Sequence, residues 1–370
     1  MSRQESARLD PDEQPDEDDK GSPGDRLDPE LRTVAVVVVS ACRPAPELAA
    51  TSQAHASETS AAAAPAPATP PRGNSPTRCG IEMRNVALHV ADGVVLNVRS
   101  LDGEFVSRVA GEPPVFDDPR SYTLRIRAAD LALDAASLTR LIQQQMAGFE
   151  ASPIRDVRVT IADGAFQAAG KLHKGVTVPF SMTAEVSAAS DGSLRLHARK
   201  LKAAGVPIKG LLDLLGLDVG ALMKMPEGSG IRADGDDLLM DTAAMLPPPR
   251  TEGRVQEVAV SGERLTMRLT GPGAPPSKPS TRPLPSARNY LYFFGGRIRF
   301  GKLTMMDADL QLIDAEPRDA FDFFPAHYDA QLVAGYSRNT PRKGLQVFMP
   351  DYARVAANGR KLTAPPVGQF

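Results

Sequence analysis

The chain has 370 residues, of which 42% are hydrophobic and 24% are charged. This length and composition are typical of one large globular domain or two ordinary ones. The net charge of −2 does not support a nucleic-acid partner. No apolar run in the sequence approaches the roughly 18 residues that a membrane-spanning helix needs.

The sequence lacks the motifs of the common enzyme classes. Its two cysteines, Cys42 and Cys79, exclude a cysteine-rich zinc site and a disulfide framework, and its five histidines are scattered. We find no dinucleotide fingerprint, no phosphate-binding loop, no nucleophile elbow and no HExxH. We therefore expect a protein that is not an enzyme and has no catalytic residues, no metal and no cofactor. An enzyme acting on envelope lipid or glycan remains an alternative.

The N-terminal segment divides at an apolar run. Residues 1–30 hold eleven acids against four bases and are too poor in apolar residues to order themselves. Residues 31–42 contain the run Val34–Val39 and end in Ser40-Ala41-Cys42, which resembles the lipobox of bacterial lipoproteins. We expect Cys42 to carry a lipid anchor that holds the chain on a membrane of the bacterial envelope, facing the periplasm. The alternative is a buried strand in a cytoplasmic protein.

Residues 43–80 have the composition of a disordered tether. Of the 35 residues from 43 to 77, 26 are Ala, Pro, Ser or Thr. Such a chain is unfolded, and one of this length spans about 30–40 Å. A spacer of this kind is a usual companion of a lipidated cysteine and a poor neighbour for a core strand.

Residues 81–270 have the sequence pattern typical of an antiparallel meander of strands. Apolar and polar residues alternate in short runs, which indicates strands with one wet face. Clear examples are Val157–Ile161, Leu194–Ala198 and Leu265–Leu269. Asp-Gly pairs, which favour tight hairpin turns, occur at 92–93, 102–103, 163–164, 191–192 and 234–235. The polar face of one such run carries His197, which we interpret as an exposed strand residue.

Two helices are expected to interrupt the strands. The first, Ser137–Phe149, is amphipathic, with Arg140, Gln143 and Gln144 on its polar face. The second runs from about Pro207 to Met225 and has so narrow a polar face that nearly its whole circumference must be buried. Two interpretations stay open: this helix is simply core, or it lines a groove for an apolar ligand. The candidate ligand-lining residues are Leu211, Leu212, Leu215 and Leu222.

Residues 271–288 contain six prolines and are expected to form a linker or loop before a β-rich, aromatic region at 289–370. In that region we expect strands at Gly296–Phe300 and Leu303–Ile313. We expect the side chains of Met306, Ala308, Leu310 and Leu312 to face inward. We expect those of Asp307, Asp309 and Gln311 to be exposed to solvent. The acidic residues at 307, 309, 314, 316, 319 and 322 are read as a solvated face rather than a calcium site. We expect the aromatic side chains of the C-terminal region to belong to the core, with a membrane interface or a partner surface as alternatives. These residues are Phe321, Phe323, Phe324 and Tyr328.

Residues 131–270 resemble the LmeA-like family of bacterial phospholipid-binding envelope proteins. The resemblance lies in the order of elements: Ser137–Phe149, Val157–Gly164, Gly175–Phe180, Asp191–Leu196, Gly205–Ile208 with the leucine-rich helix, the strand pair at 229–241, and Met245–Pro249. It implies an architecture like tubular lipid-binding (TULIP) domains and, more loosely, AsmA-like proteins. In that architecture a curved antiparallel sheet wraps around helices and leaves an apolar groove, and the family brings no catalytic residues.

The sequence therefore predicts a mainly β, α+β fold: a curved antiparallel half-barrel sheet packed on two helices. The predicted role is non-catalytic binding, extending to transfer, of a lipid or other long apolar molecule by a membrane-tethered lipoprotein. The alternative is a structural or assembly lipoprotein with a closed core that docks a protein partner through residues 290–352.

Overall fold

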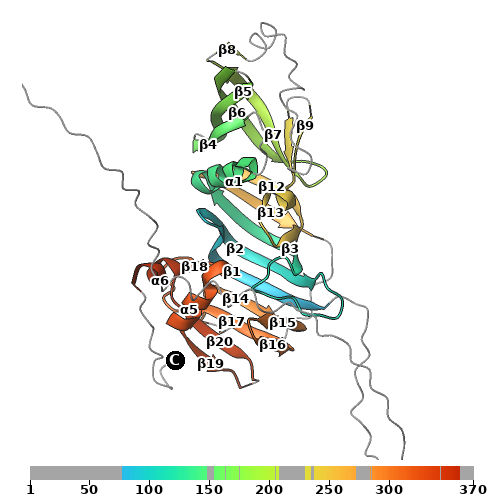
Figure 1. Ribbon diagram of the computed structural model, residues 1–370, viewed down its shortest axis with the longest axis vertical. Helices are drawn as coiled ribbons and strands as arrows, with labels where there is room; N and C mark the ends of the chain where they lie inside the picture. The colour runs from blue at the N-terminus through green and yellow to red at the C-terminus, as the bar shows by residue number, and fades with distance from the viewer. Residues whose placement is uncertain are drawn as a thin grey trace, which may run out of the picture. The chain divides into compact units, whose positions relative to one another are not determined.

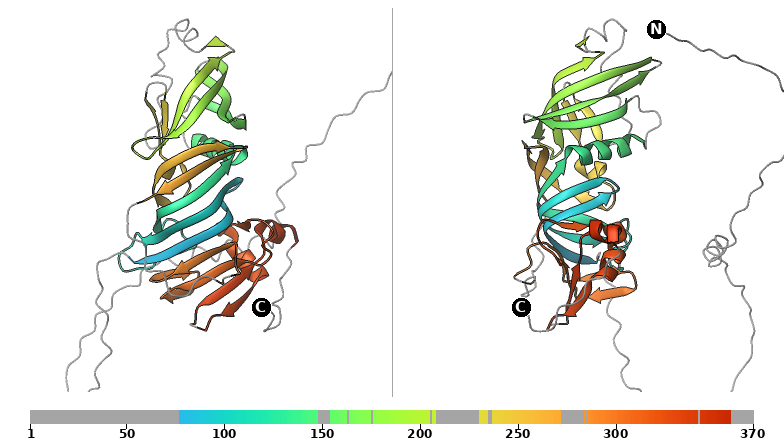
Figure 2. Two further views of the ribbon diagram at one scale, coloured as in Figure 1. Left: turned by 180° about the vertical axis from the view of Figure 1, so that it is seen from behind. Right: turned by 90° about the vertical axis from the view of Figure 1, so that its left-hand side faces the viewer.

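The computed structural model describes residues 77–147, 154–162, 164–174, 176–204, 206–207, 230–234, 237–271, 284, 286–341 and 343–358. These residues are mainly strand, and the strands build a curled antiparallel half-barrel sheet with few helices (Figures 1 and 2). The predicted mainly β, α+β fold class is confirmed. The acidic N-terminal segment, the lipobox segment and most of the predicted tether lie outside the described residues. Residues 78–80, at the predicted end of that tether, already belong to the first strand.

The larger sheet follows the order β12-β13-β3-β2-β1-β14-β17-β20-β19, with β11 paired to β3 and β18 paired to β1. Most of its pairs are antiparallel; β11–β3, β18–β1 and β17–β20 are parallel. Its strands are β1 (Arg78–Ala91), β2 (Val94–Ser107), β3 (Tyr122–Asp134), β11 (Arg250–Glu252), β12 (Arg254–Ser261), β13 (Arg264–Thr270), β14 (Tyr290–Phe294), β17 (Asp309–Asp314), β18 (Phe321–Phe323), β19 (Tyr336–Asn339) and β20 (Leu345–Met349). Because β14 pairs directly with β1, strands from before and after the proline-rich segment belong to one sheet.

The second sheet follows the order β4-β5-β6-β7-β10-β9, with β8 paired to β7. Its strands are β4 (Ile154–Ala162), β5 (Ala165–Lys174), β6 (Val176–Ala188), β7 (Leu194–Ala203), β8 (Val206–Pro207), β9 (Ile231–Asp234) and β10 (Asp237–Met240). A separate hairpin joins β15 (Arg297–Phe300) to β16 (Leu303–Met306). All pairs in the second sheet and in this hairpin are antiparallel.

The described helices are short. They are α1 (Ala135–Ala147), α4 (Thr242–Met245), α5 (Tyr328–Ala334) and α6 (Tyr352–Asn358), with a 3₁₀ turn, η2, at Pro325–His327. Helix α1 matches the predicted amphipathic helix within two residues at each end. Within the described part of the chain, none of the helices combines the length and hydropathy needed to cross a membrane.

Alternation along the strands sends apolar side chains to one face, as the sequence predicts. On β4, Val157, Val159 and Ile161 are buried while Arg158 and Thr160 are exposed. The same pattern holds on β13, where Leu265, Met267 and Leu269 are buried, and at the start of β7. Apart from Val157, these side chains belong to a continuous core that draws on both sheets.

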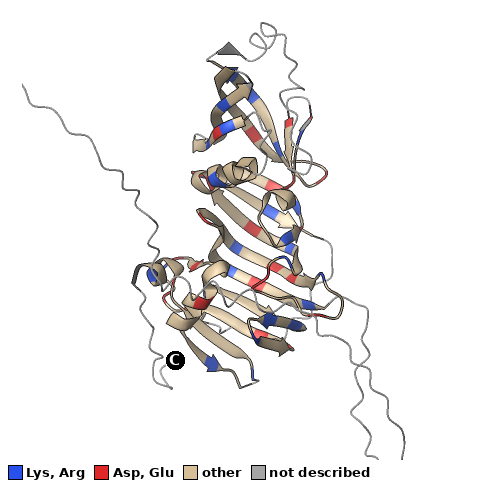
Figure 3. Cartoon of the chain, in the orientation of Figure 1, with Lys and Arg blue, Asp and Glu red and all other residues tan. Residues whose placement is uncertain are grey.

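Charged residues of both signs are interspersed along the strands (Figure 3). Several form ion pairs with a neighbouring strand, such as Arg125 Nε with Glu252 Oε2 at 2.7 Å and Arg268 Nη1 with Glu257 Oε2 at 2.5 Å. His197 lies on such a polar face. It is half-buried, and its Nδ1 is 2.7 Å from Asp237 Oδ1.

Helix α1 covers the edge of the second sheet. Its start is fixed by Asp134, whose side chain accepts a hydrogen bond from the Ser137 backbone N–H at 2.7 Å. The Thr139 hydroxyl accepts from the Val159 backbone N–H at 2.8 Å, and Gln143 donates to the Val157 carbonyl at 2.8 Å. Since β4 is the edge strand, these bonds satisfy backbone groups that a free edge would leave open.

Asp92-Gly93 and Asp191-Gly192 lie between consecutive antiparallel strands, as predicted, and Asp102-Gly103 does not. Asp163 and Gly235, from the other two pairs, lie outside the described residues. Asp102-Gly103 lies inside β2, at a shift of register against β3. A Cβ on Gly103 would lie 2.5 Å from the Arg125 carbonyl oxygen. Glycine is therefore needed here because two backbones approach closely at a bulge, and the prediction of a turn was wrong at this pair.

Two further expectations need correction. Pro207, predicted to open the second helix, lies in strand β8 against Lys202. Met306 and Gln311 are reversed: Met306 is 64% exposed, whereas Gln311 is 2% exposed. The predicted single strand at 303–313 is in fact two, β16 and β17. The bend between them breaks the alternation, and β17 is buried on both faces.

The C-terminal aromatics are interior side chains. Phe321 and Phe323 are fully buried and Phe324 is 6% exposed, so the core interpretation is confirmed for these three. Tyr328 is half-buried, and its ring meets the edges of Phe116 and Phe300.

Candidate ligand-binding pocket

An apolar pocket of about 380 Å³ opens on the inner face of the larger sheet. This volume lies within the range of small-molecule sites, about 300–1,000 Å³. The strand residues that line it include Met83 and Leu88 on β1, Leu96 and Leu101 on β2, and Leu124 and Ile126 on β3. On β3 the two residues are two positions apart and share one side of the strand, so there the alternation that builds the core also builds this wall. On β2 a register shift between Val98 and Ser100 interrupts the alternation between Leu96 and Leu101.

The pocket is long in the strand direction. On β3 its lining residues extend from Tyr122 to Leu131. Nine residues of strand at about 3.3 Å each correspond to about 30 Å. One leaflet of a bilayer's hydrocarbon core is about half that thickness, so an extended acyl chain fits within the length of the wall.

The segment after α4 forms a second wall. Asp241 caps α4 by accepting a hydrogen bond from the Ala243 backbone N–H at 2.9 Å. The chain then runs through Leu246 and the three prolines Pro247–Pro249, all of which line the pocket. Prolines have no backbone N–H, so this wall presents few hydrogen-bond donors.

One end of the pocket is aromatic. The rings of Phe105 and Tyr122 stack with their centroids 4.3 Å apart, and Phe116 contributes from the loop between β2 and β3. That loop is held by backbone hydrogen bonds between Phe116 and Arg299 and between Arg299 and Pro114. These contacts hold the loop, and with it the aromatic end of the pocket, against β15.

Polar groups are few along the lining. Its ionisable side chains are one carboxylate, Asp117, and one imidazole, His89, apart from the Tyr122 phenol. No lysine or arginine is among the lining residues of the described chain. Asp117 accepts hydrogen bonds from the Tyr328 hydroxyl and from the Gly301 backbone N–H, both at 2.5 Å. Tyr122 is 4% exposed.

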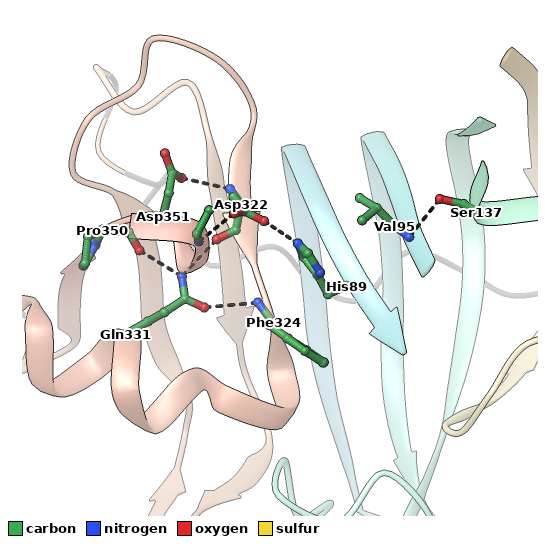
Figure 4. A network of polar contacts seen from close by, with 9 residues as sticks. His89, Val95, Ser137, Asp322, Phe324, Gln331, Pro350 and Asp351 are labelled. Atoms are coloured by element: carbon green, nitrogen blue, oxygen red, sulfur yellow. Dashed lines mark hydrogen bonds and ion pairs between the residues drawn. The ribbon is translucent and has the colours of Figure 1, made fainter. Parts of the chain in front are cut away.

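His89 belongs to a polar network that ties β1 to the C-terminal segment (Figure 4). Its Nε2 is 2.5 Å from Asp322 Oδ1, and its ring stacks on Phe324 with centroids 5.1 Å apart. Gln331, fully buried, accepts from the Phe324 backbone N–H and donates to the Asp322 carbonyl. The Asp322 N–H in turn donates to Asp351 at 3.0 Å. The network therefore holds η2 and α5 beside β1.

Carboxylates in this region have shifted acidities. Burial, opposed by a hydrogen bond from Asn289 and reinforced by the charge of Asp319, raises the pKa of Asp314 to about 6. Burial likewise raises the pKa of Asp351 to about 6. The hydrogen bond from the Asp322 N–H opposes this shift, and the charges of the nearby carboxylates reinforce it. Burial alone would raise the pKa of Asp322, but hydrogen bonds from His89 and from the Ala353 N–H outweigh it and lower that pKa.

The acidic cluster is thus not a uniformly solvated face, because Asp314 is 3% exposed. Within the described residues, no group of three or more Cys, His, Asp or Glu side chains could hold a metal ion. Cys79 is a buried free thiol, and burial raises its pKa to about 12, so it is an unreactive core residue.

The structure does not place any of the predicted site residues. Cys42, Leu211, Leu212, Leu215 and Leu222 all lie outside the described residues. Strands β4 and β7, expected to form the groove's far wall, contribute buried core residues and do not line it.

Sequence reasoning missed the lining of β1–β3, although a signal was present. Apolar residues alternate through Val94–Val98 and Tyr122–Ile126 just as they do on the strands that were recognised.

We compared the chain with protein-family models, with curated proteins and with solved structures, and none of them matches it.

Proposed function

We propose that this protein binds a lipid or another long apolar molecule without catalysing a reaction on it. The observation that carries the proposal is the elongated apolar pocket on the inner face of β1–β3. An acyl chain gains about 0.8 kcal/mol for each methylene it buries, so a long chain needs few polar contacts to bind. Transfer of the bound molecule between membranes is part of the same proposal.

The membrane tether is the second part of this proposal. Val39-Ser40-Ala41-Cys42 and the Ala- and Pro-rich segment after it support lipidation at Cys42. Cys42→Ser should move the protein from the membrane fraction to the soluble fraction. An intact mass that still includes residues 1–41 in cells would contradict the tether and leave the binding proposal standing.

The binding proposal is tested by a change of size at the pocket wall. Leu124 lines the pocket, whereas Leu265 is 1% exposed in the packed core and does not line it. Leu124→Phe should occupy the pocket, reduce lipid uptake several-fold and change the free energy of unfolding by less than about 1 kcal/mol. Leu265→Phe, the matched control, overpacks the core and should cost about 1–3 kcal/mol.

The measurement is paired on the full chain after removal of bound lipid. Uptake from phospholipid vesicles is read by mass spectrometry of the recovered protein, and stability is read by urea unfolding of the same sample. Two results together would contradict the proposal: wild-type protein that takes up no lipid, and a Leu124→Phe variant as destabilised as Leu265→Phe. The cavity would then behave as closed core.

A further inference from the structure

The free cross-section of the pocket is small. Its volume is about 380 Å³, and its lining on β3 extends from Tyr122 to Leu131, about 30 Å of strand. Dividing the volume by this length gives a mean cross-section of about 13 Å². Carbon atoms in contact lie about 3.5–4.0 Å apart, so one alkyl chain occupies about 12–16 Å² and two chains side by side need about double that area. The pocket therefore has the width of a single chain.

The volume also limits the length of chain that the pocket can hold. An engineered apolar cavity of about 150 Å³ binds one benzene molecule, which has six carbon atoms. At the same degree of filling, a volume of 380 Å³ holds about 15 carbon atoms. One long acyl chain has about this number of carbons, whereas a lipid with two such chains carries double.

The wall opposite the sheet is anchored at both of its ends. Before Pro247–Pro249, the Met245 carbonyl accepts a hydrogen bond from Gln145 Nε2 of α1 at 2.7 Å. After the prolines, β11 pairs with β3, where Thr251 lies opposite Leu124. Moving this wall outward to admit a second chain would break these contacts.

The aromatic end of the pocket is equally constrained. The ring of Phe116 meets the rings of Phe293 and Phe300, with centroids 5.5 and 4.6 Å apart. These rings belong to the packed core. The pocket cannot lengthen in this direction without displacing them, so its capacity is set by the fold.

We infer that the pocket accepts one hydrocarbon chain of about 15 carbons at a time and prefers single-chain lipids to two-chain lipids. Single-chain lipids of this kind are fatty acids, long-chain alcohols and lysophospholipids. A two-chain lipid can place one chain in the pocket, but its second chain stays outside and its methylenes add nothing to binding. This inference rests on the proposed function and names the ligand class for that site.

The first test compares two lipids that share a phosphocholine headgroup and the same total number of chain carbons. Palmitoyl lysophosphatidylcholine has them in one chain, and dioctanoyl phosphatidylcholine divides them between two. Each competes with a fluorescent acyl probe for the lipid-free full chain, at concentrations below micelle formation. We expect the single-chain lipid to bind at least about tenfold more tightly, because each further methylene that enters the pocket raises affinity about fourfold. Equal affinities would show that two chains lie side by side, which overturns the inference and leaves the proposed function standing.

The second test changes the capacity of the pocket. Straight-chain fatty acids from octanoate to icosanoate compete with the same probe, and affinity for the wild-type protein should rise with length and level off at about 15 carbons. Leu124→Ala removes about three carbons from the wall, so affinity should level off about three carbons later. Leu265→Ala, the matched control, removes the same atoms from the core and should not move this limit.

A limit that stays in place in Leu124→Ala, or that moves equally in Leu265→Ala, overturns the inference alone. Failure of both phosphocholine lipids and of every fatty acid to compete would overturn the proposed function as well.

Discussion

Strands β2 and β14 belong to one sheet but are buried differently. On β2 the buried side chains face inward and the outer face is partly wet. All five residues of β14 are buried, with Leu291 and Phe293 in the main core. On the outer side Tyr290, Tyr292 and Phe294 pack in a second cluster with Ile313 and Phe348.

The two regions also differ in what fills the inner face. Beside β14 the rings of Phe293, Phe116 and Phe300 meet one another with centroids 4.6–5.5 Å apart and form a solid aromatic core. Beside β2 and β3 the inner face is largely aliphatic and leaves the pocket. The two-sided aromatic region is therefore expected to contribute most to stability, and the one-sided aliphatic region carries the pocket for which we propose ligand binding.

The largest expected effect comes from truncation on the two sides of this comparison. Phe293→Ala removes a fully buried ring and should lower the free energy of unfolding by about 3–5 kcal/mol. Leu124→Ala enlarges a pocket that already exists, so it should cost about 2 kcal/mol or less. Urea unfolding of both variants measures the difference. Equal losses would mean that the pocket wall is packed as tightly as the aromatic core.

A pH dependence should come from the aromatic region. The pKa values of Asp314 and Asp351 are raised from 3.8 to about 6, so each carboxyl favours its protonated form in the folded state. The stability they contribute is fully present below about pH 4 and is lost as pH rises through 6. We therefore expect the free energy of unfolding to be higher at pH 5 than at pH 7.5, by on the order of 1–2 kcal/mol after solvent screening.

Thermal unfolding across this pH range measures the effect. The lowered pKa of Asp322 acts in the opposite direction, but its loss falls below about pH 4, outside the window. Asp351→Asn should raise stability at pH 7.5 and flatten the profile, while Glu263→Gln in the exposed turn between β12 and β13 should leave it unchanged. A profile that falls from pH 7.5 to 5 would show that these carboxyls are not buried as described.

Outside the two regions compared, α1 should protect the edge of the second sheet. Thr139→Val removes the hydroxyl that accepts from the Val159 N–H, a buried group, and should cost about 1–3 kcal/mol. Hydrogen exchange should then speed up at the Val159 amide. Gln144→Ala, which removes an exposed contact to the Asp92 carbonyl, is the control and should change little. Unchanged exchange at Val159 would show that the edge is protected by packing alone.

The smallest effect on stability is expected on the solvent-exposed face of the larger sheet. Arg268→Gln breaks the exposed ion pair with Glu257 on the neighbouring strand. Exposed pairs contribute about 0–1 kcal/mol, so stability should fall by less than about 1 kcal/mol. A larger loss, measured by urea unfolding, would indicate that this face is covered in the folded protein.

Local patterns predicted much of the fold. Alternation identified β4, β7 and β13, helical spacing identified α1, and Asp92-Gly93 and Asp191-Gly192 marked connections between strands. The prediction of a turn at Asp102-Gly103 failed because a bulge and a turn both favour glycine, for different reasons. The prediction that Gln311 is exposed to solvent failed because residues distant in sequence, such as Leu284 and Gln346, cover its side of β17 and hydrogen-bond its side chain.

The pocket was beyond local reasoning for the same cause. Its lining combines β1–β3 with Pro247–Pro249, Leu269 and Phe323, and no spacing rule brings these segments together. The resemblance directed attention to the leucine-rich segment at 207–225 for an apolar lining. The described lining lies on other elements, although Met245–Pro249, part of that resemblance, leads into it.

The mass of the native full chain, purified without detergent, tests the central claim most directly. Native mass spectrometry before and after organic extraction should show a bound apolar molecule, about one per chain, that extraction removes and that the Leu124→Phe variant lacks. Identical masses before and after extraction, together with no uptake of added lipid by the extracted protein, would contradict the account and identify the pocket as a cavity of the core.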